Sequence, residues 1–256
     1  MKKITTRQLA LAGILGGLVA VMAFTPIGFI PIGPIRATIL HIPVIIAAIF
    51  GGYWVGGAVG LVFGIMSFLQ APTDPTFAPI WALGDFRSIF LIGVIALVPR
   101  VLIGLVSAFV YKRTEKIPMK WSTVIFGVVQ LLAFSFNLFQ MIQNIQNGEP
   151  YWVNIIIGVA ILVLVALVAK NHAKYNMQVV LTAVMGTLTN TLLFILMAYN
   201  FFKHDFALAF GINVATVRDL WITAGITNGL PEILLAVVLV NYISLGLIAA
   251  NKNRTA

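Results

Sequence analysis

Long apolar runs, interrupted by short charged clusters, constrain this chain more than any other feature of its sequence. The runs lie at about 8–25, 38–52, 53–70, 87–111, 121–145, 151–170, 177–200 and 221–249. Only 9% of the 256 residues are charged, whereas a soluble domain has roughly 25%. One membrane-spanning helix needs about 20 apolar residues. The sequence therefore predicts an all-α integral membrane protein with about eight spans in a single transmembrane domain, 1–256, and the lipid bilayer as its solvent.

The second and third runs are the hardest to separate, because no charged residue occurs between Ile42 and Thr73. Glycine is a poor residue for a helix interior. The pairs Gly51-Gly52 and Gly56-Gly57 therefore favour a break between two spans over one long helix.

Positive charge supports the same break and predicts the orientation. With eight spans and a cytoplasmic N-terminus, eleven of the sixteen Lys and Arg are cytoplasmic: Lys2, Lys3, Arg7, Lys112, Arg113, Lys116, Lys120, Lys170, Lys174, Lys252 and Arg254. A single helix over 42–70 would reverse several of these clusters, against the positive-inside rule. We expect a multi-pass plasma-membrane protein with both termini cytoplasmic. The net charge of +9 then faces anionic lipid rather than nucleic acid.

Residues 25–37, between the first two runs, contain Pro26, Pro31 and Pro34. Proline prevents a regular helix there. We expect either an ordinary interfacial loop or a lid over the bundle.

Two ionisable residues, Arg100 and Glu232, lie inside apolar runs. A charge at the bilayer centre costs roughly 2.5–3.5 kcal/mol on insertion scales, so such residues usually face the interior of a bundle. At ~1.5 Å per residue, Arg100 lies about 18 Å from the outer end of its helix, Glu232 about 16 Å, Asn190 about 15 Å and Asn228 about 10 Å. These similar depths predict a polar cavity that opens outward.

Helix periodicity places these polar residues on shared faces. Thr187, Asn190 and Thr191 stand at i, i+3 and i+4, and Asn228 and Glu232 stand at i and i+4, so each set lies on one face of its helix. Asparagine side chains in membrane helices also form hydrogen bonds that hold two helices together. That structural role for Asn190 and Asn228 stays open as the alternative to ligand binding.

Proline precedes both ionisable residues, at Pro99 and Pro231. Because proline has no N–H, each leaves a helix carbonyl without its usual donor. The forked, permanently charged guanidinium of Arg100 suits a carboxylate or phosphate on a ligand. The alternative is a structural ion pair between Arg100 and Glu232. His41, near the outer end of the second run, is either a helix-end residue or a ligand or proton-relay group.

Small residues recur every four positions on two runs, which favours close helix packing. On the first run they are Ala12, Gly16 and Ala20, and on the third they are Gly56, Gly60 and Gly64. The first set either packs within the chain or docks a partner protein.

Motifs for an independent energy source or for catalysis are missing from the sequence. It has no Gly-x-x-x-x-Gly-Lys-Ser/Thr, no His-Glu-x-x-His, no Gly-x-Ser-x-Gly and no cysteine, so nothing calls for a metal or a cofactor. We expect a transporter subunit, not an enzyme, whose energy is supplied by a partner protein.

Several short motifs together resemble one family. They are Thr38-Ile-Leu-His-Ile-Pro-Val-Ile-Ile, Phe63-Gly-Ile-Met-Ser-Phe, Pro99-Arg-Val-Leu-Ile-Gly, Gly186-Thr-Leu-Thr-Asn-Thr and Asn228-Gly-Leu-Pro-Glu. In order and spacing they are similar to the substrate-binding S-components of energy-coupling factor (ECF) vitamin transporters, most of all to the pantothenate-specific members.

The resemblance implies a six-helix core, here 1–112 and 177–250, with an inserted helical hairpin at 121–170. It also implies a transmembrane partner subunit and two cytoplasmic ATPase subunits, docking through Ala12, Gly16 and Ala20, and a lid at 25–37. Arg100 and Asn190 match the ligand contacts of the pantothenate members.

We therefore expect the chain to bind a vitamin, pantothenate first, with riboflavin, folate or cobalamin as alternatives. Arg100 would pair with its carboxylate, and Asn190 and Asn228 would bond its hydroxyl and amide groups; Glu232, Thr187 and His41 complete the candidate site. Two other hypotheses remain from the sequence: a membrane enzyme or structural subunit with a buried Arg100–Glu232 pair, and a self-sufficient ion-coupled carrier.

Overall fold

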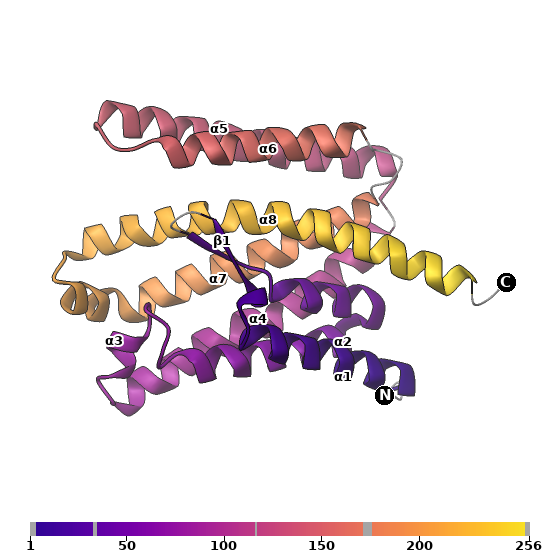
Figure 1. The fold of residues 1–256 in the computed structure, drawn as a ribbon, viewed down its shortest axis with the longest axis horizontal. Helices are drawn as coiled ribbons and strands as arrows, with labels where there is room; N and C mark the ends of the chain where they lie inside the picture. Colours follow the sequence, from indigo (N-terminus) through magenta and orange to yellow (C-terminus); the bar gives the residue numbers. More distant parts are fainter. Residues whose placement is uncertain (1–3, 33–34, 116, 171–175, 254–256) are drawn as a thin grey trace.

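The computed structural model describes residues 4–32, 35–115, 117–170 and 176–253. It is an elongated bundle of long helices that run side by side (Figure 1). The helices are α1 (Thr6–Ala23), α2 (His41–Gln70), α4 (Phe86–Thr114), α5 (Met119–Gln146), α6 (Trp152–Lys170), α7 (Met177–Phe210) and α8 (Val214–Asn253). Shorter elements are a 3-10 turn (Pro26–Gly28), the antiparallel strands β1 (Phe29–Ile32) and β2 (Ile35–Thr38), and α3 (Ala78–Trp81).

Local sequence signals fix where several helices begin and end. Thr5 caps α1 in a reciprocal capping box with Gln8, which satisfies N–H groups that have no partner in the first turn. Asp85 and Asn176 cap α4 and α7 with side-chain oxygens. Gly211 ends α7 with φ of 64°, a left-handed conformation that glycine adopts without steric penalty.

The two ends of the bundle are named here after residues that lie at them. At one end, the Gln8 side chain donates to the carbonyl of Gly51 at 3.2 Å, and Gln178 donates to Tyr111 at 2.6 Å. We refer to it as the Gly51 end; α1 begins and α8 ends there (Figure 1). At the opposite end α4 begins after its cap Asp85, and we refer to it as the Asp85 end.

α2 is folded back on itself at Gly52, whose φ of 75° and ψ of −164° interrupt the helix. A Cβ atom on Gly56 would lie 3.0 Å from the Cα atom of Ala48, so the two arms run antiparallel. The break predicted at the glycine pair is therefore present. The first arm begins only at His41 and is roughly 16 Å long at ~1.5 Å per residue. It is shorter than the span expected over 38–52, because β2 occupies the residues up to Thr38.

Six helices in the described ranges are long and apolar enough to cross a membrane: α1, α2, α4, α5, α7 and α8. α6 has a shorter apolar stretch, Asn154–Ala166. The all-α membrane fold is confirmed. The β hairpin is its one described exception. The count of eight passes would need the short first arm of α2 and α6 as well, and it stays a prediction.

Glycines let α2 approach α4 closely. A Cβ on Gly56 would lie 2.9 Å from the carbonyl oxygen of Gly104, and a Cβ on Gly60 would collide with the carbonyl of Arg100. Gly64 makes a similar approach. The close packing predicted from the four-residue repeat is confirmed, and it fixes the backbone that carries Arg100.

α5 and α6 lie side by side along one flank of the bundle (Figure 1). Their buried amides pair with one another: Asn137 donates to the Asn154 carbonyl at 2.9 Å, and Asn144 donates to the Asn154 side chain at 3.0 Å. These bonds serve as interhelical contacts. The assignment of 121–170 as an insertion stays a prediction.

Candidate functional site

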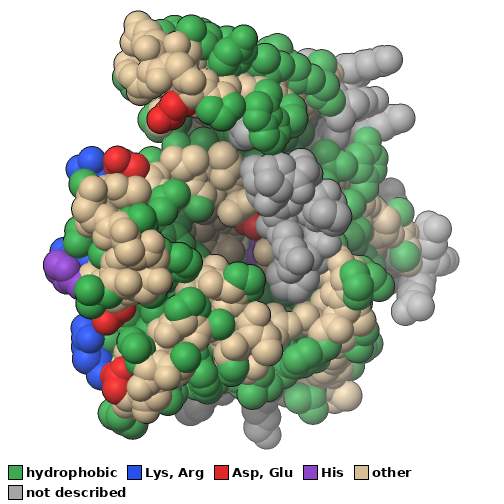
Figure 2. Space-filling view, turned by 60° about the vertical axis from the view of Figure 1, so that its left-hand side comes forward, with side chains coloured by type: hydrophobic (Ala, Val, Ile, Leu, Met, Phe, Trp, Pro, Cys, Tyr) green, Lys and Arg blue, Asp and Glu red, His purple; other side chains and the backbone are tan. Residues whose placement is uncertain are grey.

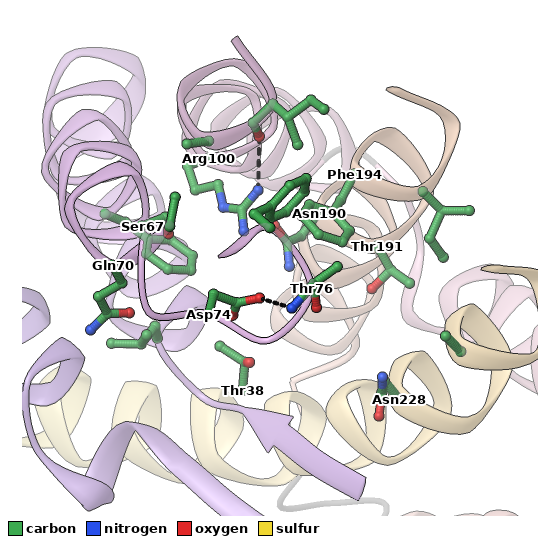
Figure 3. Close-up of a pocket in the computed structure, with 18 of the residues that line it drawn as sticks. Thr38, Ser67, Gln70, Asp74, Thr76, Arg100, Asn190, Thr191, Phe194 and Asn228 are labelled. Atoms are coloured by element: carbon green, nitrogen blue, oxygen red, sulfur yellow. Dashed lines mark hydrogen bonds between the residues drawn. The ribbon is translucent and has the colours of Figure 1, made fainter. Parts of the chain in front are cut away.

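A cavity of about 270 Å³ lies between the second arm of α2, α4, α7 and α8, toward the Asp85 end. This volume is near the lower limit of ligand pockets, roughly 300–1,000 Å³. Figure 2 shows a hollow in the middle of the face that it draws, and Figure 3 shows the cavity from close by. Its polar lining consists of Thr38, Ser67, Gln70, Asp74, Thr76, Arg100, Asn190, Thr191, Asn228 and Glu232.

Four residues that helix depth singles out, Arg100, Asn190, Asn228 and Glu232, all line this cavity. Thr187 does not, because it lies one turn deeper on α7, fully buried, with its hydroxyl donating to the Ala183 carbonyl at 2.9 Å.

His41 is also outside the cavity lining. It starts α2 fully buried between Leu40 and Ile42, both members of the main hydrophobic core. The structure therefore places it at a helix end within the core, which is the simpler of its two sequence interpretations.

The guanidinium of Arg100 is held by a carbonyl that proline leaves free. Pro99 has no N–H to donate to the carbonyl of Ile95, four residues earlier. That carbonyl instead accepts a hydrogen bond from Nη1 of Arg100 at 2.9 Å. The rings of Phe63 and Phe194 lie 5.4 Å and 5.0 Å from the guanidinium carbon, within the range of cation–π attraction.

Arg100 has no carboxylate within ion-pair distance. Among the described residues, the ion pair within 4 Å is Arg218–Asp219, at 3.0 Å on the surface. The buried Arg100–Glu232 pair that the sequence allowed is therefore absent from the structure. The physical reason is that the two residues have other anchors: Ile95 for the arginine and Thr38 for the glutamate.

Glu232 connects α8 to the β hairpin. Its Oε1 accepts a hydrogen bond from the backbone N–H of Thr38 at 2.9 Å. The side chain is only 5% exposed, so this bond forms where a lone N–H would find no water. Thr38 belongs to the cavity wall, and Glu232 therefore positions that wall.

Several buried polar atoms in the cavity lining have no protein partner. They are Nε of Arg100, Oδ1 of Asn190 and Oδ1 of Asn228. Buried polar groups in native proteins are nearly always hydrogen-bonded to protein, water or ligand. Their convergence on one cavity is what a binding site for a polar solute requires.

Sequence reasoning missed the contribution of residues 71–86. Asp74 and Thr76 line the cavity, and Oδ1 of Asp74 accepts the backbone N–H of Thr76 at 2.8 Å. The available signal was an acidic residue between Pro72 and Pro75 in a short loop that follows a span.

Aromatic rings surround the cavity on the side of α7 and α8. Trp221 lies 5.8 Å from Phe194 and 5.2 Å from Phe206, and Phe77 lies 5.8 Å from Phe194, all measured between ring centroids. Such rings exclude water and strengthen the electrostatic interactions of Arg100 with a ligand.

The small-residue strip of α1 packs inside the chain. Gly16 is buried, and a Cβ there would lie 3.5 Å from Val62 on α2; Ala12 and Ala20 are half-buried. The exposed glycines of α1 are Gly13 and Gly17, on the neighbouring face. The contact of Gly16 with Val62 is packing within the chain, and the role of Ala12, Gly16 and Ala20 in docking a partner stays a prediction.

Comparisons with known proteins identify the family of this chain. The family model for the ECF transporter, substrate-specific component, matches residues 7–147, more than half of the chain and including α5. The pantothenic acid transporter PanT of Lactococcus lactis subsp. cremoris (strain MG1363) is 38% identical over 89 residues, which cover 31% of this chain and 43% of that protein. The match thus spans less than half of that relative's length. By its family match, its spans and its cavity, this chain belongs to the substrate-specific components of ECF transporters.

Proposed function

We propose that this chain binds pantothenate in the described cavity and delivers it to an ATP-driven ECF module for uptake. The observation that carries the proposal is Arg100, which lines the cavity beside the unpartnered oxygens of Asn190 and Asn228 and, among the described residues, has no carboxylate within 4 Å. A cation in a membrane bundle that no carboxylate contacts directly is suited to an anionic ligand.

The chemistry of the cavity matches that of pantothenate. Its carboxylate can accept N–H groups from a guanidinium, and Nε of Arg100 has no protein partner. Its amide and hydroxyl groups match the free side-chain oxygens of Asn190 and Asn228. The 270 Å³ volume disfavours a ligand as large as cobalamin.

The rest of the transport cycle needs partners. The proposal includes a transmembrane subunit, two cytoplasmic ATPase subunits, and an orientation in which the Gly51 end faces the cytoplasm. Support comes from the positive charges that cluster at 112–120 and near both termini, from the family match, and from the name of the relative in Lactococcus.

Isothermal titration of the detergent-solubilised protein tests the proposal. We expect pantothenate to bind stoichiometrically, Arg100→Ala to weaken binding at least about 30-fold, and Arg100→Lys to fall between, because lysine lacks the fork. Arg113→Ala, which removes an exposed cation on the same helix, is the matched control and should bind like the unchanged protein.

Two results would overturn parts of the proposal. A folded protein that binds another carboxylated vitamin and not pantothenate would remove the substrate assignment. Uptake that persists in cells without any ATPase partner would instead favour an ion-coupled carrier.

A further inference from the structure

The fixed charges of the cavity divide it into two ends. A guanidinium can only donate hydrogen bonds and an ionised carboxylate can only accept them, whereas amides and hydroxyls adapt by rotation. The lining holds one fixed donor, Arg100, and two carboxyl groups, Asp74 and Glu232, each of which accepts a hydrogen bond from a backbone N–H. These three residues therefore decide which groups a ligand must present.

The acceptors are separate from Arg100. Neither carboxylate is within 4 Å of it, since the ion pair at that distance in the described ranges is Arg218–Asp219. In Figure 3, Arg100 and Asn190 lie on one side of the cavity, Thr38 and Asn228 lie on the other, and Asp74 and Thr76 lie between them.

Both carboxylates are anchored and retain acceptor capacity. Asp74 accepts from the N–H of Thr76 at 2.8 Å, and Glu232 accepts from the N–H of Thr38 at 2.9 Å. A carboxylate has about four lone-pair sites, so Asp74 keeps sites for a ligand, and Glu232 keeps capacity even with the hydroxyls of Thr38 and Thr191 nearby. Asp74, which lies between the two sides in Figure 3, and Glu232, which is bonded to Thr38 on the side away from Arg100, are together named the acceptor end below.

An anionic group at the acceptor end would have no cationic partner among the described residues of the lining. Arg100 is the one Lys, Arg or His side chain among the described residues that line the cavity, and a ligand carboxylate would occupy it. A phosphate ester adds a charge of about −1.5 to −2 and brings acceptor oxygens instead of a hydroxyl donor. Glu232 is only 5% exposed, so a like charge held close to it is repelled strongly. Asp74 is exposed, and its repulsion of an anionic group is weaker because solvent screens it.

We propose that Asp74 and Glu232 select a ligand that carries one anionic group at Arg100 and hydroxyl donors at its other end, and reject one with a second anionic group there. This inference rests on the proposed function and deepens it: the protein distinguishes pantothenate from its form phosphorylated on the terminal hydroxyl. The unpartnered oxygen of Asn190, which is 8% exposed, and that of Asn228 add further acceptors to the same cavity.

Binding constants for pantothenate and 4′-phosphopantothenate test this selection in the full-length protein. We expect the phosphorylated compound to bind at least about 100-fold more weakly. Asp74→Asn and Glu232→Gln remove charge but keep a carbonyl oxygen for the Thr76 and Thr38 N–H groups. In the double variant the ratio of the two constants should narrow at least about tenfold, with a smaller change for pantothenate.

The variants also separate charge from size, because the amides are nearly isosteric with the acids. Each single variant should narrow part of the difference in affinity between pantothenate and 4′-phosphopantothenate. The selection can therefore be tested even if the double variant is too unstable to purify. Asp219→Asn, in the exposed pair with Arg218, is the control and should leave the ratio unchanged.

Equal binding of the two compounds, or a ratio that the charge-neutral variants do not alter, would overturn the selection while leaving pantothenate binding intact. If the folded protein binds no pantothenate, the proposed function fails by itself. Thermal stabilisation by hydroxylated monocarboxylates but not by dicarboxylates would then support the acceptor end, and the reverse preference would overturn it.

Discussion

Glu232 accepts a hydrogen bond from the backbone N–H of Thr38 at 2.9 Å, across 194 residues of sequence. The bond attaches β2 to α8 at the wall of the cavity. The prolines of 25–37 left two interpretations of that segment open, an interfacial loop and a lid. The described strands β1 and β2 connect this segment to Thr38 in the cavity wall, and its role as a lid stays a prediction. We expect Glu232 to act on ligand retention through Thr38.

Replacing Glu232 with leucine should leave the Thr38 N–H without its acceptor, which costs about 1–3 kcal/mol for a buried group. We expect a lower melting temperature and faster release of bound pantothenate, measured by stopped-flow displacement. Glu232→Gln keeps an acceptor oxygen and should restore both properties nearly to their original values. Equal release rates in the leucine and glutamine variants would contradict a positioning role.

Pro99→Ala should reorganise the anchor of Arg100. Alanine supplies the N–H that proline lacks, and this N–H competes with the guanidinium for the Ile95 carbonyl, which Arg100 now contacts at 2.9 Å. We expect a protein at least as stable as the original but with weaker pantothenate binding, by roughly 3- to 30-fold if a hydrogen bond to a charged group is lost. Scanning calorimetry of both proteins measures thermal stability, and titration calorimetry measures the affinity for pantothenate. Unchanged affinity would show that the Ile95 carbonyl does not orient Arg100.

Gly60→Ala should disrupt the contact between α2 and α4 at the position of Arg100. The added Cβ would meet the Arg100 carbonyl, and overpacking of this kind costs about 1–3 kcal/mol. We expect lower thermal stability together with weaker ligand binding, because the backbone of Arg100 must shift.

Gly57→Ala is the matched control for this substitution. Its Cβ would lie 3.4 Å from the Leu105 side chain, an ordinary contact, and alanine is favoured over glycine in a helix. A Gly57 variant that loses as much stability as the Gly60 variant would remove the close approach as the cause.

Asp85 should make stability depend on pH at the start of α4. Hydrogen bonds from the Ser88 hydroxyl and backbone N–H lower the pKa of the Asp85 carboxyl below its usual value. Its folded-state pKa is thus below the unfolded one, so the stabilisation is present above the unfolded value of about 3.9 and is lost as the pH falls through the folded one. We expect the difference in melting temperature between the original protein and Asp85→Asn to shrink below about pH 4; a constant difference would contradict this.

The sequence predicted the helices and much of the cavity for the same reason: a helix converts position into depth and direction with a fixed rise and period. Helical spacing alone therefore placed Arg100, Asn190 and Glu232 at similar depths with Asn228 above them, and Pro99 indicated that a carbonyl near Arg100 is free. The break at Gly51-Gly52 followed from glycine and from the distribution of positive charge.

The tertiary structure alone decided which neighbour each of these groups has. It paired Glu232 with Thr38 rather than Arg100, turned Gly16 toward Val62, and brought Asp74 from a loop into the cavity. Helical spacing gives the face of a residue but not the partner opposite it, and a loop without regular dihedral angles has no period from which its position follows. Apolar runs and buried charges thus determined that a polar cavity exists in this membrane protein, and long-range packing determined what that cavity can hold.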